Sequence, residues 1–281
     1  MPTPTRWRSA PWADRLAGLD AGSSIGTVRI DLNADVGEGF GPWSLGEDEA
    51  LIPLVTSVNV ACGLHAGDPL TIERTIRIAV EHRVAIGAHP GYPDLAGFGR
   101  RAMDLSPAEI EATVIYQVGA VATFARSAGA ELRHVKAHGA LYNRAARDRA
   151  AAAAIARGVR RCGRDLVLVG LAGSALLDAG SEAGLEVAAE AFADRGYEPD
   201  GSLRGRGHPD ALLDEPEDAA AQAVSIVTDG SVRAVDGSTV RVAADTLCIH
   251  GDAPGAAARA RAVRSALEAV GVRVAAADRD R

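Results

Sequence analysis

Polar side chains able to do acid–base or metal chemistry recur at the ends of short apolar runs in this sequence. Asp31, Asn33 and Asp35 end or follow the first run, and alternation along an extended chain puts all three on one face. Four of the seven histidines also follow such runs, whereas chance placement would scatter them. The candidate site residues at the later runs are Asn59, His65, His89, Lys136, His138, Glu190, Arg195, His250 and Asp252. This pattern predicts one site built from many strand ends.

Histidines and carboxylates that converge without cysteine are compatible with two kinds of chemistry. One is a zinc or manganese ion that activates water, for which the candidate ligands are Asp31, His65, His89 and His250. The other is metal-free acid–base catalysis by Lys136 and carboxylates. The sequence lacks the His-Glu-x-x-His motif of zinc proteases, and residue spacing does not separate the two possibilities.

Lysine usage singles out one position in the chain. Lys136 is the only lysine, although lysine and arginine together number 30. A lysine kept where arginine serves elsewhere suggests a need for a compact, titratable amine. We therefore expect Lys136 to carry a role in the chemistry of the site.

Two basic segments that contain glycine are candidates for holding an anion. Residues 98–101 read Phe-Gly-Arg-Arg, and residues 203–208 read Leu-Arg-Gly-Arg-Gly-His. Backbone amides and guanidinium groups in such loops can bind a carboxylate or a phosphate. A Gly-Lys-Ser/Thr phosphate-binding loop is absent, since Ala137 follows the only lysine.

Apolar runs alternate with helical patterns along the chain. The expected buried parallel strands are Val28–Asn33, Ser57–Val60, Val84–Ala88, Leu132–Lys136, Leu166–Val169, Leu185–Ala189 and Thr246–His250. The expected helices are Glu47–Val55, Pro69–His82, Ser106–Ala128, Asp148–Cys162, Ser174–Ala183, Pro216–Thr228 and Ala256–Val270, with a β-hairpin at Val232–Val242. The alternation predicts a single (β/α) barrel domain over residues 27–281 with seven or eight strands, and an open doubly wound sheet is the alternative. In a barrel all strand ends share one rim. A residue at the rim contributes little to the core, so replacing Lys136 should leave the fold intact.

Composition argues against several classes of function. The net charge of −7 and the aromatic content of 4% disfavour binding to nucleic acid or to an anionic membrane. Three scattered cysteines disfavour a disulfide framework and suggest a reduced, cytoplasmic protein. No apolar run is long enough to span a membrane. Residues 1–26 lack the apolar centre of a secretion signal, and we expect them to form a flexible extension outside the fold.

Six motifs in a fixed order give the sequence a resemblance to a known family. They are Asp31–Glu38, Asn59–Asp68, Gly87–Pro90, Lys136–Asn143, Phe192–Tyr197 and His250–Asp252. From about Val28 to Val274 the chain resembles the LamB/YcsF family, the A subunits of ATP-dependent 5-oxoprolinases. The resemblance implies a barrel related to those of glycoside hydrolases and polysaccharide deacetylases. One departure is Ala137, where the family usually has a proline between the lysine and the histidine.

The resemblance also implies an activity, which is the cleavage of 5-oxo-L-proline (pyroglutamate) to L-glutamate coupled to ATP hydrolysis. ATP would be the cosubstrate of a complex with subunits B and C, and the need for a divalent metal is left open. A stand-alone metal-dependent deacetylase or amidohydrolase is an alternative. So is a non-catalytic regulatory subunit.

Roles for individual residues follow as hypotheses from this implied reaction. Asp35 or His65 would act as the base, and Lys136 and Arg195 would stabilise developing negative charge. The histidines expected to orient these groups are His138 and His250. The expected substrate-binding residues are Asp31, Asn33, Asn59, His89, Glu190, His250 and Asp252.

Overall fold

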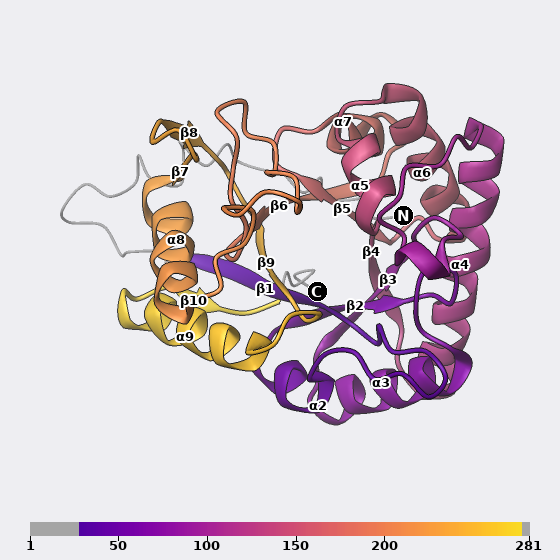
Figure 1. Ribbon diagram of the computed structural model, residues 1–281. Coiled ribbons are helices and arrows are strands. Elements are labelled where there is room, and N and C mark those ends of the chain that lie inside the picture. The colour runs from indigo at the N-terminus through magenta and orange to yellow at the C-terminus, as the bar shows by residue number, and fades with distance from the viewer. Residues whose placement is uncertain (1–27, 277–281) are drawn as a thin grey trace, which may run out of the picture.

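Short apolar segments form the strands of a closed parallel barrel. The computed structural model describes residues 28–276, and Figure 1 shows its strands as a ring. The seven barrel strands in this described part are β1 (Arg29–Val36), β2 (Ser57–Ala61), β3 (Ala85–His89), β4 (Leu132–Lys136), β5 (Val167–Leu171), β6 (Glu186–Phe192) and β9 (Thr246–His250). The ring closes because β1 pairs with both β2 and β9, which places Asp35 beside Asn59 and His250. The expected barrel is confirmed with seven strands, and the open doubly wound sheet is wrong.

Helices cover the outside of the ring (Figure 1). They are α2 (Asp48–Leu51), α3 (Pro69–Glu81), α4 (Pro107–Ser127), α5 (Gly139–Ala145), α6 (Arg149–Cys162), α7 (Ala175–Glu182), α8 (Pro216–Asp229) and α9 (Ala256–Ala269), with 3-10 turns at Ile52–Leu54 and Leu95–Gly97. The N-terminus of α4 has the expected capping box between Ser106 and Glu109. The sequence did not predict α5, which has only seven residues and no side-chain cap.

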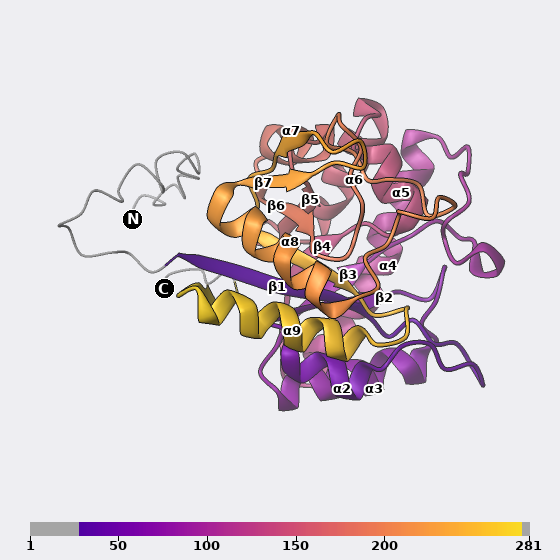
Figure 2. The same cartoon turned by 60° about the vertical axis from the view of Figure 1, so that its left-hand side comes forward.

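Three short strands lie outside the ring. The strand β10 (Arg273–Val274) pairs in parallel with the first residues of β1. The expected hairpin is formed by β7 (Ser231–Arg233) and β8 (Thr239–Arg241), which pair only with each other among the described residues. Figure 2 shows this hairpin beside α8, and Val235 just after β7 donates a backbone hydrogen bond to Tyr197 in the loop that follows β6. The hairpin therefore supports that loop.

The interior of the barrel is polar, while its apolar core lies between the strands and the helices. Along β1, Leu32 and Ala34 are fully buried in the apolar core. The alternate residues Asp31, Asn33 and Asp35 hydrogen-bond to side chains of other strands across the interior. Barrels of this type usually fill the interior with branched apolar side chains. Here the interior instead positions charged and amide groups beneath the rim.

No helix in the described part of the chain has the length and apolar character needed to cross a bilayer. The flexible extension expected at residues 1–26 lies outside the described residues. The described part of residues 27–281 forms one barrel with its surrounding helices (Figure 2).

Candidate functional site

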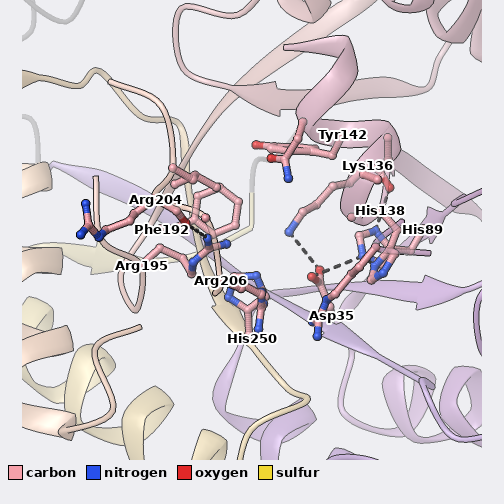
Figure 3. A pocket seen from close by; sticks show the side chains of 17 residues that line it. Asp35, His89, Lys136, His138, Tyr142, Phe192, Arg195, Arg204, Arg206 and His250 are labelled. Atoms are coloured by element: carbon pink, nitrogen blue, oxygen red, sulfur yellow. Dashed lines mark hydrogen bonds and ion pairs between the residues drawn. The ribbon is translucent and has the colours of Figure 1, made fainter. Parts of the chain in front are cut away.

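A pocket of about 180 Å³ opens at the rim formed by the carboxyl ends of the barrel strands (Figure 3). Asp35, His89, Lys136, Phe192 and His250 line it, and each is the last or next-to-last residue of its strand. The segments after β3, β4 and β6, including helix α5, contribute the other charged or aromatic lining residues, namely Arg100, His138, Tyr142, Arg195, Arg204 and Arg206. Polar residues that are far apart in the sequence therefore meet in one cavity.

Lys136 lies inside the mouth of the barrel, and only 2% of its side chain is exposed. Its ammonium Nζ is 2.9 Å from Asp35 Oδ1 and 2.8 Å from Glu190 Oε1. Burial alone would lower the pKa of Lys136, but the charges on Asp35 and Glu190 raise it well above its usual value. The amine is thus a fixed positive charge. Its burial between two carboxylates argues against the expectation that its replacement leaves the fold intact.

Asp35 lies among polar and charged side chains of neighbouring strands. Its Oδ1 accepts from Lys136 Nζ and, at 2.9 Å, from Asn59 Nδ2, while its Oδ2 lies 3.3 Å from His89 Nε2. Burial alone would raise the pKa of Asp35, but His89 and Lys136 hold it well below its usual value. A carboxylate stabilised in this way is a weak base, which argues against the base role expected for Asp35.

A hydrogen-bonded layer lies directly beneath these groups. Glu190 is fully buried and accepts from Asn33 Nδ2 at 3.0 Å and from the Tyr142 hydroxyl at 2.7 Å. Asn59 donates to Asn33 Oδ1 at 2.8 Å, and its own Oδ1 lies 2.8 Å from His134 Nε2. Burial lowers the pKa of His134 to about 3, so this ring is neutral and donates to Asn59. The layer holds Glu190 in place beneath Lys136.

Asp31 lies deeper still, away from the pocket. It accepts hydrogen bonds from the hydroxyl groups of Thr56, Ser57 and Thr246. Burial raises the pKa of this carboxyl group. Asp31 therefore joins strands inside the barrel and is not among the residues that line the pocket.

Three histidines form a packed cluster on one side of the pocket. His89 Nδ1 lies 2.8 Å from the carbonyl oxygen of Lys136, and His138 Nε2 lies 2.8 Å from that of Phe98. The inner nitrogens of the two rings, His89 Nε2 and His138 Nδ1, are 3.0 Å apart. The ring of His65 stacks on His138 with centroids 3.9 Å apart, and burial lowers the pKa of both His65 and His138 well below the usual value.

Within this cluster, His65 lies behind His138 and does not line the pocket. Its two ring nitrogens have no hydrogen-bond partner among the described residues. The loop after β3 reaches these rings because residue 99 is glycine. Gly99 has a φ of +63°, and a Cβ there would lie 2.8 Å from His138 Cδ2 and 2.9 Å from His65 Cβ.

His250 forms a pair with Asp194, a residue of the loop after β6. His250 Nδ1 lies 2.9 Å from Asp194 Oδ1, and the His250 backbone amide donates to Asp194 Oδ2 at 2.8 Å. Burial alone would raise the pKa of Asp194, but His250 lowers it to about 2, so this carboxyl group is ionised. The carboxylate requires a proton on Nδ1, which leaves Nε2 of a neutral ring able to accept a proton.

Arg195, Arg204 and Arg206 lie across the pocket from His89 and His138 (Figure 3), and Arg100 also lines it; these four residues are called the arginine wall. Arg100 and Arg206 come from the two basic segments noted in the sequence, and both approach Asp252 Oδ2, at 2.5 and 3.5 Å. Arg195 instead donates to the backbone carbonyls of Arg204 and Ala211. Burial and the nearby Arg206 lower the pKa of Arg195 to about 10, so it remains positively charged at neutral pH. One aspartate shared by two guanidinium groups leaves net positive charge facing the cavity.

The structure distributes the expected site residues over three levels. Those that line the pocket are Asp35, His89, Lys136, His138, Arg195 and His250. Those that hydrogen-bond or form ion pairs with lining residues from behind are Asn33, Asn59, Glu190 and Asp252. Asp31 and His65 lie farther from the cavity.

Four residues that the sequence did not single out also belong to the site. Glu38 lies at the histidine cluster, Tyr142 and Phe192 line the pocket, and Asp194 pairs with His250. All four stand inside the sequence motifs around the strand ends. Their identity as site residues depends on which way each side chain turns, and the sequence pattern does not give that direction.

Within residues 28–276, two groups of side chains have donor atoms close enough to share a metal ion, with the atoms of each group within 4.8 Å of one another. One comprises Glu38, His89 and His138, and the other Asp35, Cys248 and His250. In the second group, His250 uses Nδ1 on Asp194, and burial raises the pKa of the Cys248 thiol well above its usual value. The first group contains His89, which is one of the four ligands considered from the sequence.

Comparison with known proteins identifies relatives along nearly the whole chain. The sequence profile of the LamB/YcsF family matches residues 30–281. The A subunit of 5-oxoprolinase from Chloroflexus aggregans is 59% identical over 247 residues, which cover 88% of this chain and 98% of that protein. The protein of the same name from Bordetella pertussis is 56% identical over 248 residues, covering 88% and 98%. A lactam utilization protein from Thermus thermophilus superposes with a TM-score of 0.84 at 49% identity, covering 89% of this chain and all of that one.

Proposed function

The chain belongs to the LamB/YcsF family, and from this premise we propose that it is the ring-opening subunit of an ATP-dependent 5-oxoprolinase. The proposed substrate is 5-oxo-L-proline, and the product is L-glutamate. The observation that carries the proposal is a small pocket in which a proton acceptor, His250, faces fixed positive charges on Lys136 and the arginine wall. Hydrolysis of an activated lactam needs both kinds of group.

The arginine wall suits an anionic substrate. 5-Oxoproline carries a carboxylate at neutral pH, and a phosphoryl group on its amide oxygen would add further negative charge. Arg100 and Arg206 line the cavity and are held by the same oxygen of Asp252. Guanidinium groups bind carboxylates and phosphates through paired hydrogen bonds. We therefore assign the anionic part of the substrate to this wall.

The proposed reaction consumes two water molecules after the lactam oxygen has been phosphorylated. The first water adds to the activated ring carbon, and His250 Nε2 accepts its proton while Asp194 keeps the ring oriented. The bond between this carbon and the ring nitrogen then breaks, the nitrogen takes up a proton, and γ-glutamyl phosphate remains. A second water releases phosphate and leaves glutamate. Lys136 stabilises the negative charge that develops on oxygen in both steps.

ATP handling is assigned to partner subunits. The chain has no Gly-Lys-Ser/Thr phosphate-binding loop, and its only lysine is buried between two carboxylates. Subunits B and C would phosphorylate the lactam, and this chain would open it. An activated lactam phosphate is labile in water, so direct transfer within a complex avoids its loss. The free thiols of the described chain suit a cytoplasmic complex.

Reconstitution tests this division of labour. The purified chain, subunits B and C, and the mixture are assayed for glutamate and phosphate with 5-oxoproline and ATP. We expect ATP-dependent glutamate formation only in the mixture. His250→Gln should lower that rate by ~10²-fold or more, the range for losing a general base, while His82→Gln, at the exposed end of α3, should leave it unchanged. Full activity of the chain alone would refute the proposal, and hydrolysis of N-acetyl compounds by the chain alone would support the deacetylase alternative.

A further inference from the structure

The two inner histidine nitrogens at the pocket face each other as hydrogen-bond acceptors. A backbone carbonyl only accepts, so the nitrogens that contact the carbonyls of Lys136 and Phe98 must carry the ring protons. In the neutral rings, His89 Nε2 and His138 Nδ1 then hold lone pairs, and these atoms are 3.0 Å apart. Two lone pairs at this distance repel each other unless both nitrogens bind the same cation.

Two carboxyl groups close the same space. Asp35 Oδ2 is 3.3 Å from His89 Nε2, and Glu38 Oε1 is 3.6 Å from His138 Nδ1. Glu38 is buried, and no hydrogen bond to its carboxyl oxygens is recorded among residues 28–276. A shared proton on His89 would serve one of these acceptors at a time. A divalent cation would bind both histidine nitrogens and Glu38 together.

We propose that Glu38, His89 and His138 bind one divalent transition-metal ion such as Zn²⁺ or Mn²⁺, next to the Asp35 carboxylate. Ligand bonds of ~2.0–2.1 Å in a tetrahedron place the donor atoms ~3.3 Å from one another. The 3.0 Å between the two histidine nitrogens and the 3.6 Å between His138 and Glu38 bracket this value. Two imidazoles and a carboxylate suit zinc and manganese, whereas calcium and magnesium prefer oxygen ligands alone.

The surroundings hold the histidine rings as metal-binding histidines are held. Metal-ligating imidazoles usually donate their other ring nitrogen to a carbonyl or carboxylate, which fixes the tautomer and the ring orientation. Both His89 and His138 do so here. His65 stacks flat on His138, with 7° between the ring planes, and Gly99 packs against the edge of the same ring. The donor atoms are therefore positioned before any ion binds.

The proposed metal site borders the pocket, so one side of the bound ion would be accessible from the cavity. Asp35, His89 and His138 line the cavity, whereas Glu38 does not. An ion there would make a bound water more acidic and so more reactive toward the substrate. This catalytic role rests on the proposed function, but the binding of the ion does not.

Metal binding is measured directly on the full chain, without substrate or partners. The chain is purified without a histidine tag, stripped with EDTA and titrated with Zn²⁺ and with Mn²⁺ by calorimetry, and its metal content is determined by elemental analysis. We expect one ion per chain for at least one of the two metals. We expect His138→Gln and Glu38→Gln to weaken its binding by at least ~100-fold, beyond the loss seen when only a supporting group is removed.

His208→Gln is the matched control, because His208 lies in an exposed loop outside the metal site. It should bind the ion as the unchanged chain does. Circular dichroism establishes that each variant is folded, and cobalt substitution gives a d–d absorption spectrum that should be lost in the site variants. Failure of the unchanged chain to bind a stoichiometric ion would overturn the proposal. So would equal affinity in the site variants and the control, and neither result depends on whether the reconstituted complex turns over 5-oxoproline.

Discussion

Replacing Lys136 by methionine should separate the electrostatic role of the amine from its role in folding. The substitution keeps an unbranched side chain but leaves the fully buried Glu190 without its 2.8 Å partner, and it removes the ammonium group that pairs with Asp35. Removing one partner of a buried ion pair typically costs ~3–5 kcal/mol of unfolding free energy. At ~2–4 °C per kcal/mol for chains of similar size, the Tm should fall by roughly 6–20 °C.

The double variant Lys136→Met/Glu190→Gln distinguishes the two roles. The new glutamine side chain would carry no buried charge and would still offer an oxygen to Tyr142 or Asn33. The double variant should therefore be more stable than the sum of the single effects predicts, by ~1–3 kcal/mol in urea denaturation. Its turnover in the complex with B and C should nevertheless stay ~10²-fold or more below normal, because the positive charge is still absent. A coupling energy near zero, or normal turnover in the double variant, would refute this account.

Two further predictions concern the arginine wall and a buried histidine. Arg206→Ala should raise the KM for 5-oxoproline in the reconstituted complex by ~10-fold or more with little change in Tm, since a hydrogen bond to a charged group contributes ~1.5–3 kcal/mol. His134 is neutral in the fold with a pKa of about 3, but titrates near ~6.5 when unfolded, so the unfolded state gains its proton first as the pH falls. The contribution of neutral His134 to the free energy of unfolding is therefore fully present above pH ~6.5 and decreases as the pH falls below that value. His134→Gln should reduce the loss of unfolding free energy between pH 7 and 5.5 by ~1 kcal/mol, as measured by urea denaturation.

The predictions for Arg206 and for His134 each have a control variant. Arg101→Ala alters the arginine that follows Arg100 in the sequence. Arg101 pairs with Asp94 and does not line the pocket, so its replacement should leave the KM unchanged. Equal KM values for the two alanine variants would show that Arg206 does not bind substrate. For His134, the control is His82→Gln, whose ring is exposed. If both histidine variants kept the pH dependence of the unchanged chain, His134 would not titrate on unfolding as described.

The sequence pattern predicted the barrel because its information is local. Apolar runs such as Thr246–His250 and the capping box of α4 depend on neighbours a few residues away, and they recur in the structure at nearly the same positions. The number of strands, seven, depends instead on the pairing of β1 with β9, which no local pattern encodes. The short helix α5 was missed because seven residues without a side-chain cap produce a weak periodic signal.

The site was predictable in position but less so in detail. Strand-end residues such as Asp35, Lys136 and His250 line one pocket, since parallel strands bring their carboxyl ends to one rim. His65 follows a strand in the same way, yet it stacks behind His138. Glu38 is a ligand of the proposed metal site, but the sequence pattern gave it no role. The direction of a side chain in a loop depends on tertiary packing, which the pattern does not encode.

The site is complete only after β9 has been synthesised and has paired with β1. Thr246 of β9 hydrogen-bonds to Asp31 of β1 across 215 residues of sequence, and His250 lies beside Asp35 in the same pairing. A nascent or truncated chain that ends before β9 has two unpaired barrel edges and no His250. Such long-range pairing slows folding and exposes strand edges in the meantime. Fragments that end before β9 should therefore be substrates for chaperones and proteases, and none of them should retain partial catalysis.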